Sequence, residues 1–175
     1  AQGYTQRDAA RLIVEKNLYG LDIAKRAYQL AYFAVMMKAR QYNRRILNGE
    51  IRPNLYAIQE SNGIKRSHLC YLGDSLSEIE RNSARDQLEA VLDQLTDAKE
   101  YGSILNMEPA DWSLLERYID TAETDAQMSL DSFGLEDTQA RLHQLVKQAQ
   151  VLAQKYDVVV TNPPYMGNNS FNVKL

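Results

Sequence analysis

The stretch that decides the fold lies near the end of the chain and reads Tyr156-Asp157-Val158-Val159-Val160-Thr161-Asn162-Pro163-Pro164-Tyr165-Met166-Gly167. An apolar, β-branched run that stops at two prolines predicts a buried strand followed by a rigid loop, because each proline fixes φ and removes a backbone donor. Ligands of an open α/β sheet bind beyond the carboxyl ends of its strands. The loop is therefore a candidate binding site.

The four loop residues suggest chemistry on an amino group. The side-chain carbonyl of Asn162 and the main-chain carbonyl of Pro163 can accept the two hydrogens of one planar amine, and Tyr165 offers a face on which a ring can stack. Such bonds free the nitrogen lone pair for attack on an activated methyl group, with the protein supplying positioning and charge stabilisation. From these residues alone, a plain strand-ending turn stays open as the alternative.

This stretch resembles the amine-methylating, S-adenosylmethionine-dependent methyltransferases, above all the adenine-N6 DNA methyltransferases. The sequence Asn17-Leu18-Tyr19-Gly20-Leu21-Asp22-Ile23, together with residues 29–34, 36–40 and 54–62, is similar to the adenine-specific methyltransferases of BREX phage-defence systems. The resemblance implies a Rossmann-like sheet, S-adenosyl-L-methionine as cofactor, and double-stranded DNA as substrate, in restriction-modification or phage defence. It implies catalytic roles for Asn162, Pro163, Pro164 and Tyr165.

Four residues at two strand ends are the candidate cofactor contacts. The resemblance makes Asp22, with Ile23 beside it, the anchor for the ribose hydroxyls, which a carboxylate can bind together. Without the resemblance, a cap on the next helix is the favoured role for Asp22. Gln59 and Glu60 begin a polar loop that suits the adenine edge of the cofactor. A plain polar turn is the equal alternative there.

The chain predicts an α/β fold, a partial Rossmann-like methyltransferase sheet with a mainly helical insertion. The core comprises residues 1–63 and 131–175, the second to fourth strand units, and the insertion comprises residues 64–130. Hydrophobic periodicity and capping residues predict the elements. Helices are expected at 5–16, 24–47, 75–95, 111–119 and 137–155, and strands at 17–23, 55–59 and 157–160.

The far end of the long helix predicted at 24–47 is basic. Favourable cations at a helix C-terminus are the favoured interpretation of this cluster, ahead of a DNA contact. Met36 and Met37, on the same helix, are expected in the core. The basic residues are Lys38, Arg40, Arg44, Arg45 and, after the turn, Arg52.

Composition limits the possible functions. A net charge of −3 argues against binding nucleic acid by bulk charge, so DNA contact needs a local basic patch. One cysteine excludes an internal disulfide, and with only two histidines no metal site is expected. We expect a reducing, cytoplasmic setting and no membrane association, because no stretch approaches the length of an apolar span.

A Gly-rich turn that methyltransferases of this kind need is absent, since no two glycines are separated by a single residue. We therefore expect this sequence to be a piece of a longer protein that binds DNA as a whole, with other phage-defence proteins as further candidate partners. Alone, it should bind the cofactor poorly and methylate nothing measurable. Its open sheet edges predict self-association.

Two other functions stay open at this stage. Methylation of a protein glutamine or of an RNA guanine amine is one alternative, because methyltransferases that act on those amines use the same four-residue loop. A non-catalytic helical interaction module, with the sheet as a scaffold, is the alternative from another class.

Overall fold

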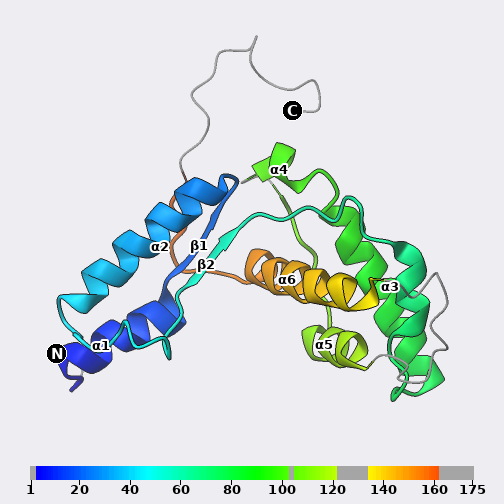
Figure 1. Cartoon of the computed structure of the whole chain (residues 1–175), viewed down its shortest axis with the longest axis horizontal. Coiled ribbons are helices and arrows are strands. Elements are labelled where there is room, and N and C mark those ends of the chain that lie inside the picture. The colour runs from blue at the N-terminus through cyan, green and yellow to red at the C-terminus, as the bar shows by residue number, and fades with distance from the viewer. Residues whose placement is uncertain (1–2, 103–104, 122–133, 162–175) are drawn as a thin grey trace, which may run out of the picture. The chain divides into compact units, whose positions relative to one another are not determined.

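The computed structural model describes residues 3–102, 105–121 and 134–161 of the 175-residue chain. The chain divides into two compact units, Ala1–Ile58 and Gln59–Leu175. The first holds a small parallel sheet and the second is helical in its described parts (Figure 1). The architecture is therefore mixed α/β and mostly helical.

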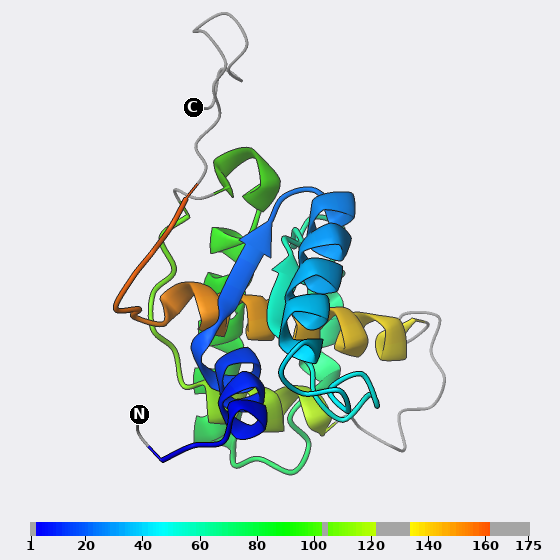
Figure 2. The same cartoon turned by 90° about the vertical axis from the view of Figure 1, so that its left-hand side faces the viewer.

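The first unit is built on two parallel strands joined by a long helix. Tyr19 pairs with Asn54 at one end of the ladder, and Asp22 pairs with Ala57 at the other. The connecting helix packs against both strands (Figure 2). In chain order the elements are α1 (Gln6–Leu12), a π-helical turn (Ile13–Asn17), β1 (Tyr19–Asp22), α2 (Lys25–Arg40) and β2 (Asn54–Ala57).

Local signals explain the start of this unit. Thr5 caps α1 by accepting a hydrogen bond from the backbone N–H of Asp8, and its hydroxyl donates to the Asp8 carboxylate at 2.6 Å. The Asn54 side chain donates to the main-chain oxygen of Glu15 at 2.7 Å, which ties β2 to the π-helical turn. A small core forms from Val14, Met36, Ala39 and Ile46, with Tyr32, Val35 and Ile51 packed against it.

The long helix ends earlier than predicted, at Arg40 rather than near residue 47. Asn43 explains the end: its buried side chain accepts a hydrogen bond from the backbone N–H of Arg45 at 3.2 Å, and its main-chain oxygen accepts from Ile46. Such local bonds compete with the helical ladder. The prediction that Met36 lies in the core is confirmed, whereas that for Met37 is wrong, because 38% of Met37 is exposed.

The second unit is a helical assembly around one apolar core. Helix α5 packs against both α3 and α6. Ser77 and Glu80 form a capping box at the start of α3, and hydrogen bonds from Ser77 are the main cause that lowers the pKa of Glu80. The elements are a 3-10 turn (Arg66–Tyr71), α3 (Glu78–Gln94), α4 (Ala98–Tyr101), α5 (Trp112–Asp120) and α6 (Leu135–Ala153).

The strand predicted at 157–160 is not present. Val158, Val159 and Val160 have no strand structure and are 78%, 74% and 91% exposed. The prediction of a buried strand there is wrong, because a strand needs a partner and, within the described ranges, only β1 and β2 pair. The predicted core that joins residues 1–63 and 131–175 stays a prediction. It requires further strands beside β1 and β2, and the described residues contain only these two.

We predict that Gly73→Ala destabilises the second unit by about 2–4 kcal/mol. Gly73 has φ of +76°, and a Cβ there would lie 2.4 Å from Cδ2 of the buried Tyr118 ring, so left-handed strain adds to a clash. Tyr118 cannot easily move, because its hydroxyl donates to the main-chain oxygen of Leu69.

Gly63→Ala is the matched control. Gly63 has φ of +78°, but a Cβ there meets no described atom within 4 Å, so we expect a loss of only about 1 kcal/mol. Denaturant unfolding of both variants measures the difference. Equal losses would show that the Tyr118 contact carries no energetic weight.

Candidate functional site

Asp22 ends β1, at the carboxyl edge of the parallel pair. Its main-chain oxygen accepts a hydrogen bond from the backbone N–H of Ile58 at 2.8 Å, so the ladder extends one residue past β2. Its carboxylate oxygen Oδ1 accepts from the backbone N–H of Ala24 at 2.8 Å, just before α2. The side chain is exposed, and Oδ2 has no hydrogen-bond partner among the described residues. The interpretation of Asp22 as the cap of the next helix is wrong, because the N-cap of α2 is Ala24 and has no side-chain hydrogen bond. Asp22 instead fixes the turn before the helix, and its role toward a cofactor stays a prediction.

The neighbours of Asp22 are partly apolar. Ile23 is about half exposed, so its side chain offers a surface rather than a core contact. On β2, burial raises the pKa of the Tyr56 hydroxyl, with smaller contributions from Tyr19 and Tyr28. Tyr56 is therefore a neutral group at neutral pH.

Gln59 begins the second unit and is held by its backbone. Its N–H donates to Oε1 of Gln148 at 2.7 Å, and its main-chain oxygen accepts from Nε2 of the same amide at 3.1 Å. Gln148 lies on α6 and is 1% exposed. One side chain therefore satisfies both backbone groups of Gln59, as a neighbouring strand would, and Gln59 itself is exposed.

The rest of the 59–63 loop is bound to the segment after α3. Glu60 accepts from the backbone N–H of Lys99 at 3.3 Å and forms an ion pair with the Lys99 ammonium at 3.6 Å. The Asn62 amide exchanges two hydrogen bonds with Asp97, at 2.8 and 2.9 Å. The Ser61 hydroxyl donates to the main-chain oxygen of Leu92, near the end of α3. The loop is a fixed platform rather than a loose turn.

The predicted site residues fall in three places. Asp22 and Ile23 belong to the first unit, and Gln59 and Glu60 belong to the second. The proposed catalytic residues Asn162, Pro163, Pro164 and Tyr165 lie outside the described residues. Their roles stay predictions.

The structure adds Gln148, Asp97 and Lys99, which sequence reasoning missed as partners of the loop. Gln148 carried a readable signal, because it is a polar residue on the apolar face formed by Leu145 and Ala149. A buried amide on such a face must find a hydrogen-bond partner. Lys99 lies 39 residues from Glu60, so local patterns carried no comparable signal.

Two histidines lie in the second unit. His68 is buried, and its Nδ1 lies 2.8 Å from the Thr138 hydroxyl. His143, on α6, lies 3.1 Å from the Asp120 carboxylate at the surface. Within the described ranges, no group of three or more His, Cys, Asp or Glu residues could hold a metal ion. In the same part of the chain, no helix has the length and apolarity needed to cross a membrane.

The chain belongs to the Eco57I restriction-modification methylase family, whose model matches residues 16–174. It is 35% identical over 170 residues to the adenine-specific methyltransferase PglX of Lacticaseibacillus casei (strain Zhang). That alignment covers 96% of this chain and 14% of PglX. It is 34% identical over 192 residues to the adenine-specific methyltransferase BrxX of Escherichia coli O9:H4 (strain HS). That alignment covers 98% of this chain and 15% of BrxX. The predicted resemblance is confirmed, and the chain spans about one seventh of these relatives.

We predict that Gln148→Ala destabilises the second unit by about 2–4 kcal/mol, because it leaves the N–H and carbonyl of Gln59 without partners. Amide hydrogen exchange at Gln59 should accelerate. Gln144→Ala, at an exposed position of the same helix, should change the free energy of unfolding by no more than about 0.5 kcal/mol. Unchanged exchange at Gln59 in the Gln148 variant would contradict the platform.

Proposed function

We propose that the protein carrying this chain transfers a methyl group from S-adenosylmethionine to the N6 amine of adenine in DNA, in restriction-modification or phage defence. The family match over residues 16–174 carries the proposal. The sequence Asn162-Pro163-Pro164-Tyr165 supports an exocyclic amine as the acceptor. We further propose that β1 and β2 are two strands of a larger Rossmann-like sheet.

In this proposal the adenine is flipped out of the duplex and stacks on Tyr165. The Asn162 side-chain carbonyl and the Pro163 main-chain carbonyl accept the two N6 hydrogens and expose the nitrogen lone pair, and Pro164 keeps the loop rigid. The cofactor supplies an electrophilic methyl group on a sulfonium. The nitrogen–carbon bond forms as the carbon–sulfur bond breaks, and the amine then loses one proton to solvent.

The described residues fit this cofactor in one respect. Asp22 offers an exposed carboxylate at the carboxyl end of a parallel strand, fixed by its bond to Ala24, and a carboxylate there suits ribose hydroxyls. Ile23 provides an apolar surface beside it. We propose Gln59 and Glu60 as contacts to the adenine edge of the cofactor, with the Gln59 side chain at the surface and Glu60 shared with Lys99.

The first test is methyl transfer from labelled S-adenosylmethionine to unmethylated genomic DNA by the full-length protein. We expect Tyr165→Ala to lower kcat/KM about 10- to 100-fold, because it removes stacking worth about 1–3 kcal/mol. Tyr165→Phe should retain most activity, because phenylalanine also stacks. Asn162→Ala should cost on the order of 10²–10³-fold.

Tyr4→Ala, at an exposed tyrosine of the first unit, is the control and should leave turnover unchanged. The 175-residue chain assayed alone should give no label. Label on a glutamine peptide or on RNA guanine, and none on DNA, would assign a different amine. No label on any substrate, even with partner proteins added, would favour an interaction module.

A second test separates the two roles of Asp22. Asp22→Asn keeps an oxygen for the Ala24 N–H, so stability should change by less than about 0.5 kcal/mol. It removes the charge and one acceptor, so the Kd for S-adenosylmethionine should rise at least about tenfold. Asp22→Ala should lose cofactor affinity and also about 1 kcal/mol of stability, because the Ala24 N–H loses its hydrogen-bond partner. An unchanged Kd in Asp22→Asn, measured by calorimetry, would exclude Asp22 as the ribose anchor.

A further inference from the structure

The two units carry opposite charges. Residues 1–58 hold ten Lys and Arg against four Asp and Glu, a formal net charge of +6. Residues 59–175 hold ten against nineteen, a net charge of −9, and the two values give the −3 of the whole chain. A weakly acidic protein thus contains a strongly basic unit. The net charge of the whole chain therefore does not exclude a local site for a polyanion on this unit.

The basic side chains of the first unit have no acidic partners. All ten are exposed, and none forms an ion pair with another described residue. In the second unit, by contrast, Arg66 pairs with Asp93 and Arg85 pairs with Glu89. The positive charge of the first unit is therefore available to a partner.

Four arginines gather in residues 40–52, which we call the arginine segment: Arg40, Arg44, Arg45 and Arg52. The α2 dipole accounts for a cation at Arg40, in the last helical turn, but its effect fades within that turn. Arg44, Arg45 and Arg52 follow the end of the helix. A helix C-terminus therefore does not explain three of the four charges.

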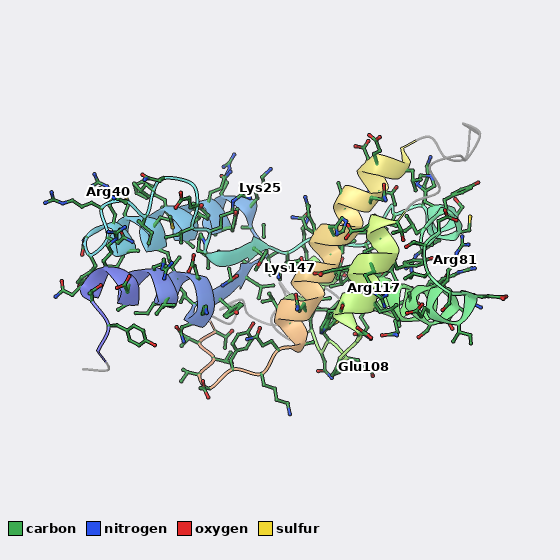
Figure 3. All side chains as sticks on the ribbon, turned by 90° about the horizontal axis from the view of Figure 1, so that it is seen from below. Lys25, Arg40, Arg81, Glu108, Arg117 and Lys147 are labelled. Carbon is green, nitrogen blue, oxygen red and sulfur yellow. The ribbon has the colours of Figure 1, made fainter. Side chains whose placement is uncertain are left out.

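The segment is held in place rather than loose. Asn43 and Ile46 are 4% and 0% exposed and anchor it on both sides of the exposed pair Arg44 and Arg45. Asn43 also fixes the turn through the backbone N–H of Arg45. Figure 3 shows Arg40, where the segment begins, at one end of α2 and Lys25 at the other. A presented, anchored segment loses little conformational entropy on binding.

We propose that the arginine segment binds the phosphate backbone of DNA without reading its sequence. This rests on the proposed function, which makes DNA the substrate. A guanidinium matches a phosphate with two parallel hydrogen bonds, and duplex DNA carries one charge per roughly 1.7 Å of its axis. Four arginines within thirteen residues suit that charge density better than the mixed charges of a protein surface.

The test uses the full-length protein and a labelled, non-cognate 30-base-pair duplex without cofactor. The variant replaces Arg40, Arg44, Arg45 and Arg52 with glutamine. The control removes the same charge from the same unit at Arg7, Arg11, Lys25 and Arg26, which are also exposed and unpaired among the described residues. Circular dichroism and thermal unfolding confirm that both variants fold.

We expect the slope of log Kobs against log salt to flatten by up to about 3.6 in the segment variant and by less than about 1 in the control, since each of the four phosphate contacts contributes about 0.9. Equal changes in the two variants, or no change in either, would overturn the proposal. So would an equal loss of binding to labelled polyglutamate, which would assign the segment to acidic protein surfaces.

This readout needs no methyl transfer. If the arginine variant flattens the salt slope but the protein methylates nothing, the proposed reaction is wrong and the phosphate site stands. If the protein methylates DNA but the arginine variant leaves the salt slope unchanged, the reaction stands and the phosphate site is wrong.

Discussion

The second unit begins at a pair of hydrogen bonds between the buried Gln148 amide and the backbone of Gln59, and these bonds fix the loop that follows. A backbone leaving a strand must satisfy its N–H and carbonyl, and here a buried side chain on α6 does so. With Gln59 fixed, Glu60 and Asn62 reach Lys99 and Asp97, and these surface contacts tie the loop to the segment after α3. A ligand that uses Glu60 must therefore share it with Lys99.

The two units of this chain carry opposite net charges, +6 for residues 1–58 and −9 for residues 59–175. At physiological salt, charges act over about 8 Å, so a partner responds to the side chains that it faces and not to the sum of −3. In the second unit, acidic residues are partly balanced by ion pairs such as Arg117 with Glu80. In the first unit, nothing described balances Arg44 or Arg45. That difference leaves the positive charge of the first unit unbalanced among the described residues, as the proposed phosphate contact requires.

Elements with local signals were predictable from the sequence. Thr5 and Asp8 mark the start of α1, the apolar spacing marks α3, α5 and α6, and β1 and β2 lie within the predicted strands apart from Asn54. The failures depend on contacts that periodicity cannot contain. Val158–Val160 have the composition of a strand, but a strand also needs a neighbour. The early end of α2 depends on the burial of Asn43, a tertiary event that outweighs helix propensity.

Asp22 stays a predicted cofactor contact, whereas its alternative role as the cap of the next helix is wrong, because that N-cap is Ala24. The bonds that Asp22 does form are compatible with the predicted contact. One carboxylate oxygen binds the Ala24 N–H, and the main-chain oxygen binds the Ile58 N–H, so both the backbone and the side-chain rotamer of Asp22 are fixed by short contacts. A carboxylate has two oxygens and about four acceptor sites, and one bond to the backbone uses a single site. The bond to the Ala24 N–H, just before α2, therefore orients the remaining oxygen, and the proposed ribose contact would use a carboxylate that is already held in place.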